Sequence, residues 1–309
     1  MRGRRILWII LIFVAVYVIW VAAQQIALGM RPKVVLARLS GPISESLDTG
    51  LFGGGGITPA QVEGMLKRAE RDPSVKALVF RIDSPGGTVA ASQAIAESIK
   101  RFKERTKKPV VVSMGDVAAS GGYYISLFAD KIIAHPGTTT GSIGVITVFF
   151  SLEELLKNLG IQAEIFKSGA YKDVGLGLRP LTDEERALVQ QYIDEFYEQF
   201  VNAVAEGRKL SVERVRELAT GQPYTGAQAL QLGLIDQLGS LEDALQTARD
   251  LAGVPNAEVI EYRPPAPGLL ELLFGRGSAT NTVLSELKPE LVYLLRVLEG
   301  WHAVPRYGN

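Results

Sequence analysis

The chain of 309 residues contains no cysteine and only two histidines. Without cysteine it can form no disulfide bond, no thiolate zinc site and no thiol nucleophile. His135 and His302 have no carboxylate neighbour in the sequence that would mark either of them as the base of a Ser-His-Asp triad. We therefore expect both histidines to be structural or exposed.

The chain also lacks a net charge, metal-binding motifs and nucleotide-binding motifs. Lys+Arg and Asp+Glu number 33 each, so no overall basic field favours nucleic acid as a partner. The sequence has no HExxH motif and no cluster of histidines and carboxylates, which argues against a bound metal. It has no GxxxxGK[ST] segment and no GxGxxG after a strand, so neither ATP nor a dinucleotide is indicated. We expect a protein without a cofactor.

One long hydrophobic run is present, at residues 6–23, where 18 consecutive residues are apolar. This length suits a transmembrane helix better than the shorter apolar region of a cleaved signal. Three arginines precede it: Arg2, Arg4 and Arg5. They should stay in the cytoplasm, which places the rest of the chain outside. The alternative is a cleaved signal peptide, because residues 21–23 (VAA) resemble a small-residue cleavage site.

Beyond this run, apolar segments typical of strands alternate with helical patterns. The predicted strands cover residues 33–39, 76–82, 109–114, 131–134, 145–150 and 161–166. The predicted helices begin near Thr58 and after Gly87, and then cover residues 182–206, 211–218, 225–232 and 239–251. Thr182 with Glu185 has the spacing of a capping box. The alternation predicts an α/β fold with mainly parallel strands.

The length and composition divide the chain into three parts. Residues 1–30 are predicted to form a cytoplasmic stub and a membrane anchor. Residues 31–262 are long enough for one catalytic domain with its own core. A proline-rich break begins at Arg263, so residues 263–309 are predicted to be a linker and an amphipathic tail.

Ser120 is the candidate nucleophile. It lies in GDVAASGGYY, residues 115–124, between a predicted strand and a helix start. A serine nucleophile needs a base to take its proton, and the shortage of histidine directs the search to lysine. The N–H of Gly121 would lie among the unpaired N–H groups of the helix start and could face an oxyanion. The alternative is that these small residues only allow tight packing of helix on strand.

The turn DSPGG, residues 83–87, also follows a predicted strand. Acyl transfer needs two donors near the developing oxyanion. The N–H groups of Gly87 and Gly121 form a plausible pair, with Gly86 as the alternative donor in the turn. An ordinary type II turn would explain the same Pro-Gly sequence.

Lys172, in SGAYKDVG at residues 168–175, is the candidate base. To accept a proton it must be neutral, and burial in an apolar site lowers the pKa of a lysine. A third group should hold the amine, and the hydroxyl of Ser142 is our candidate. Spacing alone does not select Lys172 over Lys131 or Lys167.

These residues together resemble the signal peptide peptidase A family of bacterial membrane-anchored serine–lysine proteases, in its short, single-domain form. The matching segments are RIDSPGG at 81–87, VAASGGYY at 117–124, TGSIGV at 140–145, SGAYKD at 168–173 and GLID at 233–236. The resemblance implies a Clp protease/crotonase-like spiral of β-β-α units. It implies that Ser120 is the nucleophile, that Lys172 is the base and that Ser142 orients the lysine. It also implies oxyanion donors at Gly121 and in the turn at 86–87.

The resemblance further implies a homo-oligomeric ring with its sites in grooves shared by adjacent subunits. The substrates would be remnant signal peptides and other short or unfolded polypeptides, outside a bacterial cell membrane. Three alternatives stay open from the sequence. They are a protease for membrane-associated partner proteins, a crotonase-type acyl-CoA enzyme, and an inactive oligomeric scaffold.

Overall fold

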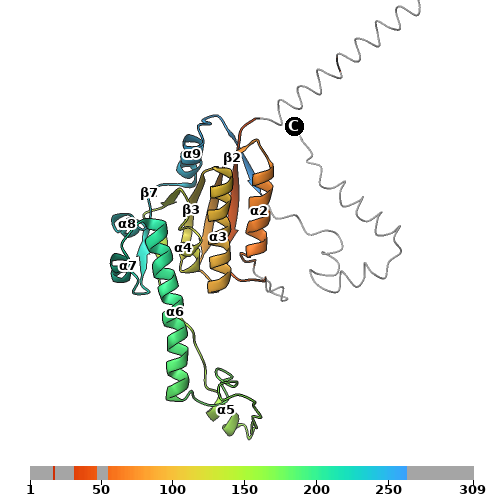
Figure 1. Ribbon diagram of the computed structural model, residues 1–309, viewed down its shortest axis with the longest axis vertical. Helices are drawn as coiled ribbons and strands as arrows, with labels where there is room; N and C mark the ends of the chain where they lie inside the picture. The colour runs from red at the N-terminus through yellow and green to blue at the C-terminus, as the bar shows by residue number, and fades with distance from the viewer. Residues whose placement is uncertain (1–16, 18–30, 47–54, 263–309) are drawn as a thin grey trace, which may run out of the picture. The chain divides into compact units, whose positions relative to one another are not determined.

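The computed structural model describes Tyr17 and residues 31–46 and 55–262 (Figure 1). Of the predicted anchor at 6–23, every residue but Tyr17 lies outside the described residues, as do the predicted linker and tail at 263–309. Within the described part of the chain, no helix is long and apolar enough to cross a membrane.

A largely parallel sheet forms the centre of the domain. Its main path runs β6-β5-β3-β2-β1-β8, and β4 joins β3 to β7 beside this path. The strands are β1 (Lys33–Ser40), β2 (Val75–Ser84), β3 (Val110–Ala119), β4 (Lys131–Ala134), β5 (Thr139–Gly141), β6 (Pro223–Thr225), β7 (Gln237–Leu238) and β8 (Glu258–Tyr262). The pairing of β5 with β6 is antiparallel, and the other pairings are parallel. The predicted α/β class is confirmed.

Helices cover both faces of the sheet. They are α2 (Pro59–Arg71), α3 (Val89–Thr106), α4 (Gly121–Tyr124), α5 (Glu153–Asn158), α6 (Asp183–Arg208), α7 (Val212–Leu218), α8 (Gly226–Gln231) and α9 (Leu241–Leu251). Thr58 accepts a hydrogen bond from the Gln61 N–H at the start of α2. Thr182 and Glu185 form the predicted capping box of α6. The local signals in the sequence therefore placed both helix starts correctly.

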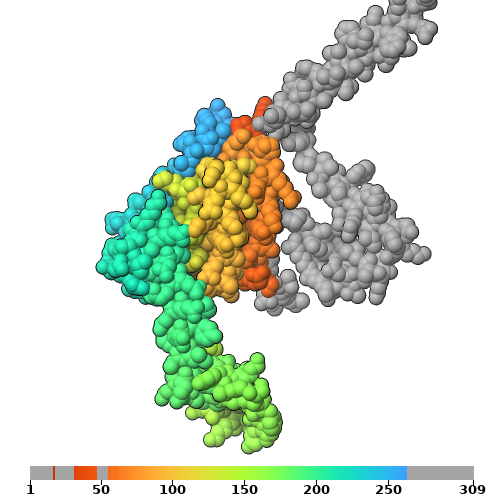
Figure 2. Space-filling view, viewed as in Figure 1, coloured from red at the N-terminus to blue at the C-terminus, as the bar shows by residue number. Residues whose placement is uncertain are grey.

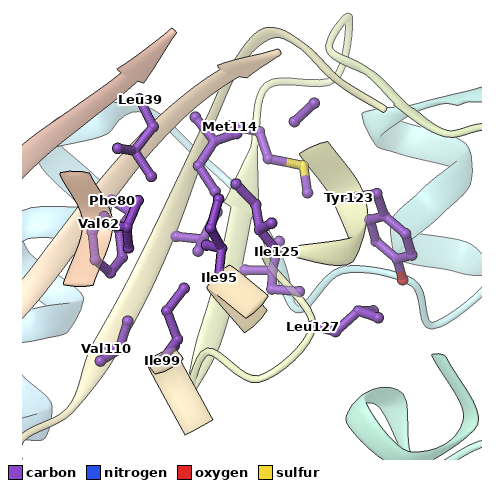
Figure 3. Packing of buried hydrophobic residues seen from close by; sticks show 14 of the residues in the cluster. Leu39, Val62, Phe80, Ile95, Ile99, Val110, Met114, Tyr123, Ile125 and Leu127 are labelled. Atoms are coloured by element: carbon purple, nitrogen blue, oxygen red, sulfur yellow. The ribbon is translucent and has the colours of Figure 1, made fainter. Parts of the chain in front are cut away.

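The core has two layers because alternate strand residues face opposite sides of the sheet. In β1, Val35, Ala37 and Leu39 join the larger cluster, with α2 and α3, whereas Val34 and Leu36 join the smaller one, with α9. Figure 3 shows the larger cluster, in which Phe80, Ile95 and Met114 lie among other apolar side chains. The apolar faces of α2, α3 and α9 are thus part of the core.

The predicted strands at 145–150 and 161–166 are wrong. Both stretches are irregular in the structure and flank the short helix α5. Their apolar side chains find no partner strand in the described part of the chain, and Ile146, Phe150 and Phe166 are 85%, 76% and 92% exposed. An apolar run marks a segment that some surface will bury, but not which surface does so. We call residues 145–182 the exposed segment; it gives part of the green surface in Figure 2.

Phe80 → Ala tests the larger core. Phe80 is fully buried in β2, so its truncation should lower the free energy of unfolding by about 3–5 kcal/mol. Denaturant unfolding measures this change. Leu251 → Ala is the control, because Leu251 is 47% exposed and should cost much less. Equal losses in the two variants would contradict this description of the core.

Candidate active site

Three strands end together at the edge where the predicted site residues lie. The strands β2, β3 and β5 are parallel, so their carboxyl ends share one edge of the sheet. Ser84 pairs with Ala118, and Ala119 pairs with Gly141. The turn at 85–87, Ser120 and Ser142 directly follow these paired positions. The structure therefore gathers the predicted nucleophile, turn and third hydroxyl at one edge.

Ser120 and Ser142 both have backbone conformations that are rare outside glycine. Among the described non-glycine residues, four have positive φ, and two of these, Lys107 and Lys209, are helix C-caps where a left-handed residue is common. The other two are Ser120, with φ 52° and ψ −121°, and Ser142, with φ 50°. Each such residue costs of the order of 1–3 kcal/mol, and such residues cluster at functional sites.

Backbone hydrogen bonds hold both serines in this conformation. The Ser120 N–H donates to the Gly141 carbonyl at 2.8 Å, and the Ser142 N–H donates to the Gln222 carbonyl at 3.0 Å. The Ser120 side chain makes no capping hydrogen bond to α4, although Ser120 occupies its N-cap position. The Ser142 hydroxyl donates to the Gly221 carbonyl at 3.2 Å. The Ser120 hydroxyl is therefore not committed to its own helix.

Missing side chains let the turn lie directly against the start of α4. A methyl group on Gly86 would be 2.7 Å from the Gly121 nitrogen and 2.9 Å from the Ser120 Cβ. A methyl group on Gly121 would be 3.0 Å from the Gly87 nitrogen. On Gly87 it would be 1.8 Å from the Ile43 carbonyl oxygen. The two predicted oxyanion donors, Gly87 and Gly121, are thus neighbours beside Ser120.

Hydrogen bonds fix this turn without using the Gly87 N–H. The Gly86 N–H donates to the Ser84 hydroxyl at 3.1 Å, the Ile43 N–H donates to the Gly86 carbonyl at 2.9 Å, and the Thr88 N–H donates to the Ile43 carbonyl at 2.9 Å. Among the described residues the Gly87 N–H has no acceptor. The Gly121 N–H is at the first position of α4, where a helix offers no partner. Both donors are therefore available to an oxyanion.

Lys172 is not joined to Ser120 in the single chain. It lies in the exposed segment, and its side chain makes no ion pair or hydrogen bond with any described residue. Its backbone N–H donates to the Gly169 carbonyl at 3.2 Å. The role of Lys172 as base stays a prediction.

A buried ion network beside Lys172 was missed from the sequence. Asp173 forms ion pairs with Lys167 at 2.7 Å and with Arg179 at 2.9 Å. Arg179 also forms an ion pair with Glu185 at 2.6 Å. The side chains of Asp173 and Glu185 are each 3% exposed. The hydrogen bond from Lys167, with that from Arg179, lowers the pKa of Asp173 to about 2, and the one from Arg179 lowers the pKa of Glu185 to about 2. The network ties the loop that bears Lys172 to the start of α6.

The histidines are not part of the site as far as the structure describes them. The His135 side chain is exposed, and its backbone forms a turn with Thr138. His302 lies outside the described residues. The expectation of an exposed histidine at position 135 is confirmed.

A strained serine beside paired backbone N–H donors, at the carboxyl edge of an α/β sheet, is the arrangement of a serine hydrolase. Comparison with known proteins narrows this class. The model of peptidase family S49 matches residues 102–255, and that of the NfeD1b N-terminal domain matches residues 42–149. The chain belongs to the signal peptide peptidase A family, within the S49 serine proteases.

Individual relatives agree with this assignment. The chain is 46% identical over 213 residues to the putative protease slr0021 of Synechocystis sp.. This alignment covers 68% of this chain and 76% of the relative. The chain is also 36% identical over 243 residues to the putative signal peptide peptidase SppA of Enterococcus faecium. This second alignment covers 79% of this chain and 70% of the relative. A solved mutant of the 1510-N membrane-bound stomatin-specific protease, in complex with a substrate peptide, matches with TM-score 0.50 and 20% identity. It covers 81% of this chain and 99% of that one, and it supports the fold alone.

Gly86 → Ala tests the contact between the turn and Ser120. The added methyl would strain a residue at φ 106° and push the turn from the Gly121 nitrogen, so peptide hydrolysis should fall by roughly 10²–10³-fold. Peptidase assays of the purified protein measure this loss. Gly137 → Ala is the matched control, because nothing lies within 4 Å of its added methyl. Full activity of Gly86 → Ala would remove the turn from the site.

As the pH falls, the exposed segment should lose its ordered structure at a higher pH than the sheet does. The folded pKa values of Asp173 and Glu185 lie below their ordinary values of 3.8 and 4.5, so their stabilisation is complete above about pH 4.5 and is lost as pH falls through about 2. Hydrogen exchange, corrected for intrinsic rates, should show residues 167–185 losing protection over this range. Arg179 → Gln should show the same loss already at pH 7. Unchanged protection from pH 5 to pH 2 would contradict the network.

Proposed function

We propose that this chain is an endopeptidase with a Ser/Lys dyad, in which Ser120 is the nucleophile and Lys172 is the general base. The observation that carries the proposal is the strained Ser120 next to two free N–H groups, those of Gly87 and Gly121. A serine held in this way has a nucleophilic oxygen on one side and an oxyanion site on the other. The family membership supports peptide rather than acyl-CoA as substrate.

The reaction proceeds in two steps. Neutral Lys172 takes the Ser120 hydroxyl proton, and the oxygen adds to the peptide carbonyl carbon. The Gly87 and Gly121 N–H groups stabilise the oxyanion that forms. Protonated Lys172 then gives its proton to the leaving amine as the C–N bond breaks. Lys172 then takes a proton from water, which adds to the carbonyl carbon of the resulting ester. As the bond to Ser120 breaks, Lys172 returns this proton to the Ser120 oxygen, which releases the second product and leaves both residues in their starting forms.

We propose that the dyad is completed in a homo-oligomeric ring, in a groove shared by adjacent subunits. The exposed segment carries Lys172 and has large apolar side chains, among them Ile146, Phe150 and Phe166, which are mostly exposed in the single chain. Clustered exposed apolar groups of this kind mark a surface that is covered in the functional assembly. Covering this surface would also remove water from Lys172, which favours its neutral form. The Ser142 hydroxyl, at the strand end next to Ser120, would then hold the amine.

The proposed substrates are remnant signal peptides and other short or unfolded polypeptides. A relative named as a putative signal peptide peptidase supports this class. We expect small, apolar side chains to be favoured next to the scissile bond, because the segments flanking Ser120 are themselves small and apolar. Residues 6–23 are the proposed single-pass anchor, with the catalytic domain outside the cell membrane.

Ser120 → Ala and Lys172 → Ala should each lower turnover of a signal-peptide substrate by roughly 10⁴-fold or more, as loss of a nucleophile or base does elsewhere. A fluorophosphonate probe should label the wild type but not Ser120 → Ala, and mass spectrometry should locate the adduct at Ser120. Lys157 → Ala is the matched control, because Lys157 is also exposed and without an ion pair. It should keep full activity.

Two outcomes would contradict the dyad. Full activity of either variant would remove that residue from its role. The wild-type rate should rise from neutral to alkaline pH, because the base acts only when deprotonated. A flat profile would therefore count against a lysine base even if Ser120 were labelled.

A further inference from the structure

The edge of the sheet opposite the active site is basic. Five cationic residues lie there: Arg31, Lys33, Arg71, Lys76 and Lys107. Arg31 and Lys33 stand at the start of β1, and Lys76 is the second residue of β2. Arg71 ends α2 just before β2, and Lys107 caps α3 just before β3. We call these five residues the basic edge.

The side chains of the basic edge form no ion pair, hydrogen bond or ring contact in the described part of the chain. Eight described Lys or Arg side chains make no ion pair, hydrogen bond or ring contact, and five of them belong to the basic edge. The other three are Lys157, Lys172 and Lys209. Most remaining cations are matched by a carboxylate, as Arg105 is by Glu70 and Arg208 is by Asp236. Among the described residues, unpaired positive charge is therefore concentrated at one edge, although the net charge of the chain is zero.

The carboxylates nearby only partly offset this charge. Asp72 accepts from the Ser74 N–H at 2.8 Å and from its hydroxyl at 2.5 Å. Burial raises the pKa of Asp72, but the Ser74 hydrogen bonds and the charges of Lys33 and Lys108 outweigh it and lower the pKa. Asp130 accepts from the Val110 N–H at the start of β3 and pairs with Lys103, and Glu70 pairs with Arg105. Asp250 and Glu258 also lie close to these strand starts. Among the described residues, however, no carboxylate forms an ion pair with any of the five cations of the basic edge.

The basic edge is also hollowed. A surface cavity of about 330 Å³ is lined by Lys76, Lys107 and Lys108, together with Pro73 and Leu251. Lys108 turns its amine inward, onto the Ala69 and Asp72 carbonyls. Lys76 and Lys107 are exposed and stay available to a ligand. Amines around a concave surface suit a phosphate-bearing group.

Chain connectivity brings this edge to the membrane. The apolar run ends at Ala23, and β1 begins ten residues later at Lys33. Ten residues span at most about 36 Å. If residues 6–23 insert as proposed, the start of β1 is therefore confined close to the bilayer surface. Ser120 lies beyond the far end of β3, ten residues of strand or about 33 Å away.

We propose that the basic edge docks on anionic phospholipid headgroups of the membrane in which the chain is anchored. The inference rests on the proposed anchor and is independent of the proposed chemistry. Amines attract an anionic surface over about a Debye length, so a short tether is sufficient to bring them into range. The sheet then stands with its catalytic edge about 33 Å from the headgroups, open to polypeptides outside the bilayer.

The test uses the full chain in nanodiscs of phosphatidylcholine alone or with about 30% phosphatidylglycerol, a fraction that gives an anionic surface. A water-soluble acetylating reagent probes each lysine, and mass spectrometry reads the rates. Lys33, Lys76 and Lys107 should react roughly fivefold more slowly in the anionic discs. This factor corresponds to the typical attraction between one basic residue and an anionic membrane surface. About 1 M salt should abolish the difference, because it shortens the Debye length to about 3 Å. Lys157 and Lys209 should react equally in both discs.

Matched double variants sharpen the test. Lys76 → Gln/Lys107 → Gln should return the Lys33 rate in anionic discs toward its value in neutral discs. Lys157 → Gln/Lys209 → Gln should leave the Lys33 rate unchanged. Both variants should keep wild-type turnover of a soluble peptide.

The outcomes separate the proposals from one another. A chain that fails to co-elute with either disc would overturn the anchor and this inference with it. A chain that co-elutes but shows equal lysine rates in both discs would overturn the basic edge alone. Protection that is the same in both discs and insensitive to salt would point to a second copy of the chain as the occupant, and would also overturn it. The activity of Ser120 → Ala tests the proposed chemistry separately, because neither the anchor nor the basic edge depends on Ser120.

Discussion

The site depends on the close approach of two backbones where neighbouring strands end. The Gly86–Gly87 turn after β2 and the Ser120–Gly121 step after β3 lie very close together. A methyl group on Gly86 would be 2.7 Å from the Gly121 nitrogen, and one on Gly121 would be 3.0 Å from the Gly87 nitrogen. Parallel pairing of β2 with β3 sets the register of this approach, and the absence of side chains allows it. Moving either strand by one residue would separate the two donor N–H groups from the serine.

The strain at Ser120 follows from the same constraint. The Ser120 N–H is held by the Gly141 carbonyl of β5, while its carbonyl accepts from the Tyr124 N–H in α4. A residue that must satisfy a strand on one side and a helix start on the other has little freedom in φ and ψ. The core beneath supplies the rigidity, because Tyr123 and Ile125 are fully buried. Preorganised donors of this kind need no rearrangement as charge develops.

Much of the fold and part of the site could be predicted from the sequence, because their signals are local. Thr58 and the pair Thr182/Glu185 marked helix starts, and apolar runs of three or more residues marked β1 to β4. The strands β5 to β8 have two to five residues and no apolar run longer than two, so the sequence did not reveal them. The runs at 145–150 and 161–166 read as strands because a sequence shows that a segment is apolar, but not what buries it. For the same reason the contact between Lys172 and Ser120 stays a prediction. The buried Asp173–Arg179–Glu185 network was missed because its partners are six residues apart, a spacing that matches no familiar helix or turn pattern.

The polarity of a parallel sheet links the two edges of this domain. Every parallel strand begins at one edge and ends at the other, so the turns that build the site gather at the carboxyl edge and the incoming connections gather at the amino edge. The proposed anchor at residues 6–23 precedes β1, and β1 lies in the parallel part of the sheet. If residues 6–23 insert as we propose, the edge tethered to the membrane is the amino edge, and the serine lies at the opposite, carboxyl edge. The basic edge at the strand starts and the glycine turns at the strand ends therefore lie at opposite edges of the sheet, which separates the proposed docking surface from the proposed chemistry.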